Sequence, residues 1–383
     1  MKELGKMVYT KKYIEFKSLY NPDAGNTDIE GTGISIKNSC FTSEISREGF
    51  FNRSDVSITE NITFSYPVFV PSDNKSGKVI ILLHGLNERS WIKYLTWAYY
   101  MSEQTNSYVI LFPISFHINR SPASWHDPRA LYQTMNERKS SQAGISMLSF
   151  ANIALSNRLT DDPRRFFNSG YQTVNDIVKL MKQIKEGEHE IIPAGSRVNI
   201  FAYSIGAFLA QIIMMGNPGS FFTESKLFIF CGGSVFSNMH GTSRLIMDSL
   251  AYSKVYSYYL DEFENRIKGK SELTDFLQTD TTGMAFRSMI DLGRHREYRE
   301  KAIKRIYDQT RLVALAGDSV IPAAGIVDTL DFRRGNSDHP VEVWDFKYPC
   351  SHENPFPLLE GDNSKKVDCS FEKLFAKACS FLD

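Results

Sequence analysis

The strongest constraint on the fold is a regular alternation of short aliphatic runs with helical patterns, which begins near residue 78. The runs read VIILL at 79–83, YVILFPI at 108–114, VNIFAY at 198–203, KLFIFCGG at 226–233, RLVALAG at 311–317 and VEVWDF at 341–346. Runs with so few polar residues are typical of strands that are buried on both faces of a parallel sheet. Between them, apolar residues recur at helical spacing, as at positions 174, 177, 178, 181 and 184. We therefore predict an α/β fold with a mostly parallel sheet and helices on both of its faces.

Three parts of the chain are expected to differ in structure. Residues 1–75 contain β-forming runs interrupted by Asn, Asp and Gly, and we predict that they form a β-rich N-terminal extension packed on the core. The core itself is predicted over residues 76–239 and 310–383. Residues 240–309 carry helical patterns, and we predict a helical cap insertion there, because connections of such length in a compact domain usually serve as lids or binding elements.

The charge balance excludes some classes of partner. Lys plus Arg and Asp plus Glu number 44 each, for a formal net charge of zero, and no block of basic residues is present. Without an electropositive surface we expect no binding to nucleic acid. The longest uncharged stretch, between Arg197 and Glu224, is interrupted by polar residues and glycines, whereas a transmembrane helix needs about 20 mostly apolar residues. No integral membrane association is therefore predicted.

Motifs for metals and cofactors are missing from the sequence. The five cysteines are scattered and form no C-x-x-C pair, so neither a disulfide framework nor a zinc site is indicated. No H-E-x-x-H, EF-hand, Walker or G-x-G-x-x-G pattern stands where it would bind a ligand, and we predict no metal and no cofactor. Residues 1–17 lack the apolar core of a secretory signal, so a cytoplasmic location is expected.

The most informative residue is Ser204, which stands between the predicted strand at 198–203 and an apolar helical stretch at 207–215. A sharp strand-to-helix turn needs small residues two places before and two places after its central residue, and Ala202 and Gly206 meet that need. Such a turn exposes the serine hydroxyl and directs the amide of Ile205 toward a developing oxyanion. The simpler interpretation is a serine in a tight turn. A cysteine nucleophile is not favoured, because no cysteine has such a turn around it.

The second group of candidate residues is His84-Gly85-Leu86-Asn87, which follows the run at 79–83. Gly85 would let the backbone turn beneath the edge of the sheet, so that the amide of Leu86 or Asn87 could be a second oxyanion donor. We interpret His84 as structural, a core histidine that is hydrogen bonded to the backbone.

An acid and a base are predicted after two later strands. Asp318 follows the run at 311–317, where a carboxylate could orient an imidazole, although an Asx turn would also explain it. His352 follows the run at 341–346, whereas His339 precedes it. A strand of six residues separates its two ends by about 20 Å, so only His352 can share an edge with the other candidates. Its alternative interpretation is a histidine in a surface loop.

The order of these residues along the chain resembles that of the α/β-hydrolase superfamily, in which a nucleophile, an acid and a histidine each follow a strand of a parallel sheet. The resemblance runs from about residue 78 to the end of the chain, with HGLN in place of the HGGG of many lipases and with Ala202 in place of the more common glycine. The residues that carry it are His84, Gly85, Ala202, Tyr203, Ser204, Ile205, Gly206, Gly317, Asp318, Pro322 and His352. The resemblance implies an eight-stranded, mostly parallel core with a cap inserted after the sixth strand.

The predicted function is that of a serine hydrolase of the carboxylesterase or lipase kind, which cleaves a carboxylic ester or thioester of a small molecule through an acyl-enzyme on Ser204, with His352 as general base and Asp318 as its partner. A peptidase or an acyltransferase could use the same residues, and a non-catalytic binding protein could keep the same fold. The aromatic residues at 252, 256, 259 and 263, with Met147 and Phe150, could line a pocket for an apolar acyl group. Alternatively, they pack the cap helices together. Arg158, Arg164 and Arg165 could face an anionic substrate or could simply be solvated.

Overall fold

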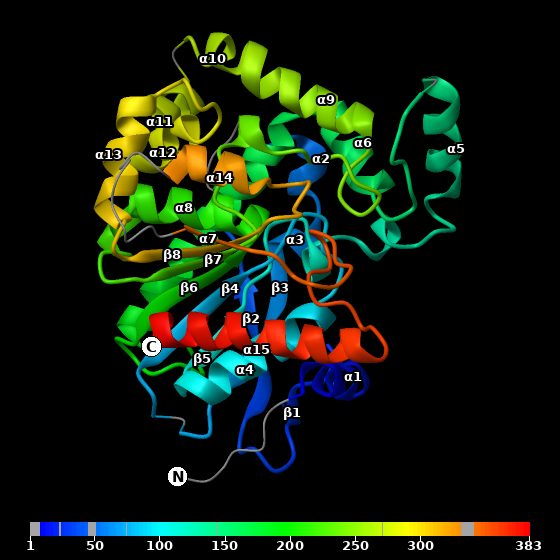
Figure 1. Cartoon of the computed structure of the whole chain (residues 1–383). Coiled ribbons are helices and arrows are strands. Elements are labelled where there is room, and N and C mark those ends of the chain that lie inside the picture. Colours follow the sequence, from blue (N-terminus) through cyan, green and yellow to red (C-terminus); the bar gives the residue numbers. More distant parts are fainter. Residues whose placement is uncertain are drawn as a thin grey trace.

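The fold is built on one nine-stranded sheet with the order β1-β2-β3-β5-β4-β6-β7-β8-β9 (Figure 1). The structure is a computed structural model and describes residues 8–22, 24–44, 51–73, 75–142, 144–269, 271–330 and 341–383. The strands are β1 (Asn26–Asp28), β2 (Ser35–Thr42), β3 (Thr63–Val70), β4 (Lys78–Leu83), β5 (Tyr108–Leu111), β6 (Arg197–Tyr203), β7 (Leu227–Phe230), β8 (Thr310–Leu315) and β9 (Val341–Trp344).

Strand direction divides the sheet into two regions. From β5 through β4, β6, β7 and β8 to β9, every neighbouring pair is parallel. At the other end β1, β2 and β3 pair antiparallel, and β3 joins β5 antiparallel through Val68 and Phe69. The mostly parallel α/β sheet predicted from the sequence is therefore confirmed, and each of the six aliphatic runs contains one of its parallel strands.

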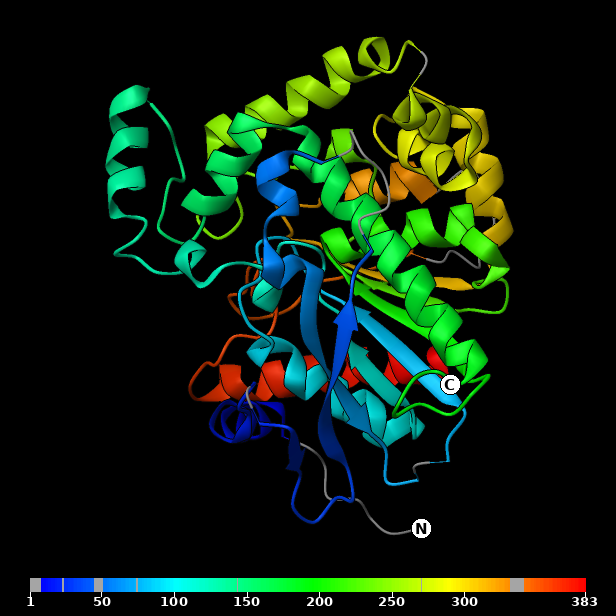
Figure 2. The same cartoon turned by 180° about the vertical axis from the view of Figure 1, so that it is seen from behind.

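The apolar runs are explained by burial on both faces of the sheet. In β4, the side chains at 79, 81 and 83 belong to one hydrophobic core and those at 80 and 82 to the other. The first core is closed by α7 (Arg164–Glu186), α8 (Ile205–Gly216) and α14 (Ala323–Leu330), and the second by α1 (Tyr9–Leu19), α4 (Ile92–Thr105) and α15 (Asp362–Leu382). Figures 1 and 2 show these two groups of helices on opposite sides of the sheet.

The residues before 76, for which we predicted a β-rich extension, supply β1, β2 and β3 to the same sheet. They also form α1 and two short helices, α2 (Arg53–Val56) and α3 (Thr59–Ile62). The longest pairing in this part joins β2 and β3 over eight residue pairs, from Ser35–Val70 to Thr42–Thr63. Through β3 these strands contact the parallel region directly.

Two long connections carry most of the remaining helices. The connection after β5 holds η1 (Ile118–Arg120), η2 (Ala123–Trp125), α5 (Tyr132–Ser141) and α6 (Ile153–Asp161), and the shorter η3 (Pro218–Ser220) follows α8. Between β7 and β8 lie η4 (Phe236–Asn238), α9 (Ser249–Ser257), the π-helical η5 (Tyr258–Glu262), α10 (Phe263–Arg266), α11 (Glu272–Thr279), α12 (Thr281–Ser288) and α13 (Arg296–Ile306). Helix α9 packs on α6, so the two connections contact each other. In Figure 1 both lie on the same side of the sheet as α8 and α14.

None of the helices in the described parts of the chain is both long enough and apolar enough to cross a membrane.

Candidate active site

Ser204 occupies a strained turn between β6 and α8. Its backbone has φ 57° and ψ −124°, a conformation that costs roughly 1–3 kcal/mol in a residue with a side chain. The turn needs glycine at position 206, because a Cβ there would lie 2.6 Å from the carbonyl oxygen of Leu83. Position 202 accepts an alanine, which is completely buried. The local geometry is thus that of the sharp strand-to-helix turn predicted from the sequence.

The structure brings together three side chains that the sequence places far apart. The hydroxyl of Ser204 lies 2.6 Å from Nε2 of His352. Nδ1 of the same ring lies 2.7 Å from Oδ2 of Asp318. An ionised carboxylate can only accept hydrogen bonds, so the ring proton is on Nδ1 and the lone pair of Nε2 accepts the serine hydroxyl. All three residues are at most 6% exposed.

Asp318 and His352 are themselves held by neighbouring groups. The second carboxylate oxygen of Asp318 accepts the amides of Val320 and Ile321, both at 2.9 Å. The hydroxyl of Tyr203 donates to the carbonyl of His352, and its ring stacks on the imidazole with centroids 5.7 Å apart. The sequence indicated Tyr203 only as part of the turn motif around Ser204. Its contact with a loop 149 residues away has no signal in the sequence.

The competing histidine, His339, lies outside the described residues.

Two of the three residues whose amides are predicted as oxyanion donors, Leu86 and Asn87, line a cleft at Ser204. Leu86 and Asn87 line it together with Ser204 and His352, and Ile205 is the first residue of α8. Within the described ranges, no group accepts a hydrogen bond from the backbone N–H of Leu86, Asn87 or Ile205. The loop is fixed at its start, because the amide of Gly85 donates to the hydroxyl of Tyr94 at 3.0 Å.

His84 lies in the core beneath this loop, as its structural interpretation requires. Nδ1 donates to the carbonyl of Gly85 at 2.8 Å, and Nε2 accepts the amide of Ile114 at 2.9 Å. Burial lowers the pKa of His84 well below its usual range, so the ring is neutral. Its hydrogen bonds join the end of β4 to the segment that follows β5.

Two cavities meet at Ser204. One is a cleft with both polar and apolar walls, called the polar cleft below because Asn87, Arg89, Ser204 and Glu353 line it. The other is apolar, and its walls come from residues before, within and after the segment 240–309 that was predicted to form a cap: Phe236, Met239, Ile246, Met247, Tyr252, Val255, Val320 and Ile321. A group bound at Ser204 would therefore have a polar side and an apolar side.

Of the aromatic residues predicted either to line a pocket or to pack helices together, some do the first and others the second. Tyr252 lines the apolar cavity beside Ser204. Tyr259 and Phe263 are buried among other core side chains and pack the helices together. Met147 and Phe150 are 49% and 40% exposed. Most of the pattern therefore reflects the packing of helices.

The three arginines considered for an anionic substrate are paired within the protein. Arg158 and Arg165 both bind Asp55, at 3.0 and 2.9 Å. Arg164 binds Asp162 at 2.8 Å. Their charges are therefore compensated internally, and neither interpretation fits Arg158 or Arg165, whose side chains are only 15% and 9% exposed.

The cysteines near strand ends do not have the properties of nucleophiles. Burial raises the pKa of the Cys350 thiol and raises that of Cys231 well above its usual range. A thiolate, the reactive form, is disfavoured at both positions.

Three buried histidines predict that the protein loses stability in mild acid. Burial lowers the pKa of His117 and of His189 to about 4, and it lowers the pKa of His84 well below its usual range. The imidazoles of an unfolded chain titrate near 6.5. The unfolded state therefore takes up protons first as the pH falls below 6.5, and the free energy of unfolding decreases down to about pH 4.

Between pH 7 and pH 5 we expect His117 and His189 each to lower the free energy of unfolding by roughly 2 kcal/mol, as measured by urea unfolding at both pH values. Nδ1 of His189 accepts the amides of Ile191 and Ile192, both at 3.1 Å, and protonation would remove this acceptor. Asparagine offers an acceptor that does not titrate, so His189→Asn should lose about 2 kcal/mol less over the same range. An equal loss in the variant and the parent would contradict the assignment.

The family of unknown function DUF6051 matches residues 42–383. Among curated proteins there is no match.

Solved structures with a similar fold include three hydrolases. A cold-adapted esterase from an Arctic intertidal metagenomic library has 8% identity and a TM-score of 0.44, over 93% of this chain and 99% of that one. An S-formylglutathione hydrolase from Agrobacterium tumefaciens has 12% identity and a TM-score of 0.46, over 93% and 98%. A hyperthermophilic esterase from Pyrobaculum calidifontis has 10% identity and a TM-score of 0.43, over 97% and 90%. The order and direction of the strands in this chain agree with what the sequence resemblance to the α/β-hydrolases implied. The strands from β2 to β9 are the eight of the expected core, and the helical insertion follows the sixth of them, β7.

Proposed function

The chain belongs to the DUF6051 family, whose function is unknown, and we propose that it is a serine hydrolase that cleaves carboxylic esters or thioesters through an acyl-enzyme on Ser204. The observation that carries this proposal is the continuous line of hydrogen bonds from Ser204 through His352 to Asp318, at 2.6 and 2.7 Å. A base within hydrogen-bond reach of the nucleophile, itself oriented by a third group, is the arrangement that activates a serine hydroxyl.

Acylation would use each of these contacts. Oγ of Ser204 forms a bond to the carbonyl carbon of the ester while its proton passes to Nε2 of His352. Asp318 stabilises the resulting imidazolium through Nδ1–H and does not take up the proton. The tetrahedral intermediate then breaks its bond to the leaving alcohol or thiol, which receives the proton from Nε2. The acyl group remains bound to Oγ.

Three backbone amides are suited to the charge that develops in this step. The carbonyl oxygen becomes an oxyanion, and the N–H groups of Ile205 and of Leu86 or Asn87 have no acceptor within the described ranges. Fixed donors of this kind stabilise the transition state because they need no reorganisation during the reaction. Hydrolysis of the acyl-enzyme repeats the sequence with water, which loses its proton to His352.

The substrate is proposed to be a small molecule with an apolar acyl group. The support for this is the apolar cavity that has Ser204 in its wall, opposite the polar cleft that contains Arg89 and Glu353. An apolar chain in the first and a leaving group in the second would place the scissile carbonyl between them.

The proposal is tested with a fluorophosphonate probe, which reacts with activated serines. We expect one adduct per chain by intact mass spectrometry, located on the peptide that contains Ser204, and none in Ser204→Ala. Hydrolysis of p-nitrophenyl esters by the same preparation then separates an esterase from a protein that only binds ligands. An unlabelled chain that also leaves every ester intact, with a normal circular dichroism spectrum, would overturn the proposal.

A further inference from the structure

A large apolar cavity lies beyond the candidate active site, between α7, α8 and the segment that follows β5. Its free volume is about 100 Å³, against about 40 Å³ for the apolar cavity beside Ser204. Its walls are almost entirely apolar and include Phe167, Tyr171, Phe208 and Leu209. The mechanism proposed above makes no use of this space.

The large cavity adjoins the candidate active site. Leu86, Phe166 and Ile205 line both the large cavity and the apolar cavity that contains Ser204. Leu86 also borders the polar cleft, and its side chain is only partly buried. Three apolar side chains are therefore shared by the two apolar spaces, and a chain attached at Ser204 could extend from one into the other past Leu86.

The polar groups that reach this cavity carry no free charge. Arg158 and Arg165 are paired with Asp55, and Glu88, which also lines the cavity, is paired with Lys93. His117 is neutral near pH 7, because burial lowers its pKa to about 4. A ligand with a charged end would therefore lose its hydration without gaining an unpaired partner.

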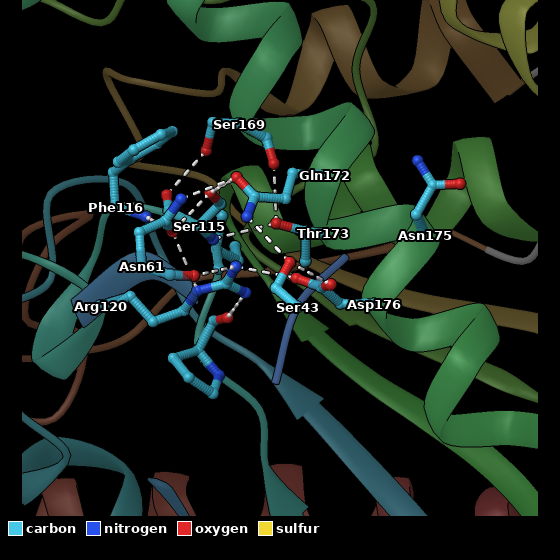
Figure 3. A network of polar contacts seen from close by, with 12 residues as sticks. Ser43, Asn61, Ser115, Phe116, Arg120, Ser169, Gln172, Thr173, Asn175 and Asp176 are labelled. Carbon is cyan, nitrogen blue, oxygen red and sulfur yellow. Dashed lines mark hydrogen bonds and ion pairs between the residues drawn. The ribbon is translucent and has the colours of Figure 1, made fainter. Parts of the chain in front are cut away.

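One wall of the cavity is held rigidly by the polar network drawn in Figure 3. The amide of Ser115 donates to Thr173, and its carbonyl accepts the hydroxyl of Ser169. The amide of Phe116 donates to Asn61. Phe116 has φ 65°, a conformation that persists only where the surroundings hold it in place. The cavity is thus largely preformed, which lowers the entropic cost of binding a flexible chain.

We infer that this cavity binds the distal part of a long, uncharged acyl chain whose carbonyl carbon is attacked by Ser204. The inference rests on the proposed function and adds to it the class of acyl group. It makes Leu86 the side chain past which the acyl chain bends, and it makes Gly170 of α7 a position that controls the usable length of the cavity.

Gly170 offers a direct way to shorten the cavity. It lines the cavity, and a Cβ at this position would meet only the Cδ1 of Leu209, at the ordinary distance of 3.9 Å. A leucine at 170 would therefore enter the empty space without a clash at its Cβ. Each buried methylene contributes roughly a factor of four to binding, and a leucine side chain displaces about three.

The experiment compares p-nitrophenyl dodecanoate with p-nitrophenyl acetate. In Gly170→Leu the ratio of kcat/KM for the long ester to that for the short ester should fall by at least about tenfold relative to the parent. Gly170→Ala controls for the loss of a helical glycine, and Lys182→Leu adds the same side chain to the same helix at a position whose side chain is 61% exposed. Both controls should keep the parent's ratio within about twofold. An unchanged ratio in Gly170→Leu would overturn the inference.

A binding measurement separates this inference from the proposed function. Calorimetry should show that dodecanoate binds to Ser204→Ala. Dodecanoate should bind at least tenfold more weakly to Ser204→Ala/Gly170→Leu than to Ser204→Ala. Dodecanedioate, which has a second charge, should bind to Ser204→Ala at least tenfold more weakly than dodecanoate does. Binding with this pattern, in a protein that hydrolyses no ester, would refute the proposed reaction and keep the cavity as a ligand site. Ester hydrolysis without any effect of Gly170→Leu on dodecanoate binding would refute the inference about the cavity and keep the proposed reaction.

Discussion

Replacing Ser204 with alanine is expected to lower kcat for ester hydrolysis by roughly four to six powers of ten, with little change in the KM of whatever activity remains. The hydroxyl supplies the atom that is acylated, and it lies 2.6 Å from Nε2 of His352, the base that would accept its proton. Steady-state kinetics on one p-nitrophenyl ester that the parent protein hydrolyses would measure the effect.

Two further variants test whether the loss of activity in Ser204→Ala comes from the proposed group of Ser204, His352 and Asp318. Asp318→Asn should lower kcat by about 10⁴, because an amide no longer selects the Nδ1–H tautomer of His352. Cys350→Ala should keep the parent's activity, since burial holds the pKa of that thiol above its usual range. Activity that survives in Ser204→Ala and disappears in Cys350→Ala would show that the nucleophile is Cys350 and not Ser204.

The largest effect on stability is expected at a buried ion pair outside the candidate active site. Arg120 and Asp176 are 0% and 1% exposed, and Nη2 lies 2.8 Å from Oδ2 (Figure 3). The guanidinium also donates to Oδ1 of Asn61 at 3.1 Å and to the carbonyl of Pro113 at 3.1 Å. Arg120→Met leaves the carboxylate buried without its cation, and the free energy of unfolding should fall by about 3–5 kcal/mol.

A double-mutant cycle distinguishes this pair from ordinary packing. The double variant Arg120→Met/Asp176→Asn removes both charges. It can keep the hydrogen bond between the hydroxyl of Ser43 and residue 176, which in the parent is 2.6 Å long and ends on Oδ1 of Asp176. The double variant should therefore be less destabilised than the sum of the two single variants, by about 2 kcal/mol. Arg164→Met is the matched control, because Arg164 lies on α7 with a side chain that is 49% exposed and should cost at most about 1 kcal/mol. Additive effects of Arg120→Met and Asp176→Asn would contradict the assignment.

Sequence periodicity was a reliable guide wherever burial alone determines the residue type. The run at 79–83 is apolar throughout because its side chains enter cores on both faces of the sheet. Gly206 was predicted from the turn, and the structure supplies the reason in the 2.6 Å approach of the Leu83 carbonyl. Strand direction favoured His352 over His339, and the structure places His352 within hydrogen-bond distance of both Ser204 and Asp318.

Other features depend on contacts between distant parts of the chain, for which a single sequence has no local pattern. The hydroxyl of Tyr203 holds the loop of His352, and Asp55 neutralises two arginines that lie about a hundred residues further along the chain. The aromatic spacing at 252–263 predicted helices correctly but not which ring would reach a cavity, and only Tyr252 lines the one beside Ser204.

The sequence by itself therefore determined the class of fold, the strained turn and the order of the candidate residues, because these follow from local periodicity and from the direction of strands. Only the tertiary structure decided which charges are paired, which amides are left without an acceptor and where an apolar space remains open beside Ser204. Those properties depend on how side chains from separate segments fill a common volume, and no local pattern of residues encodes that.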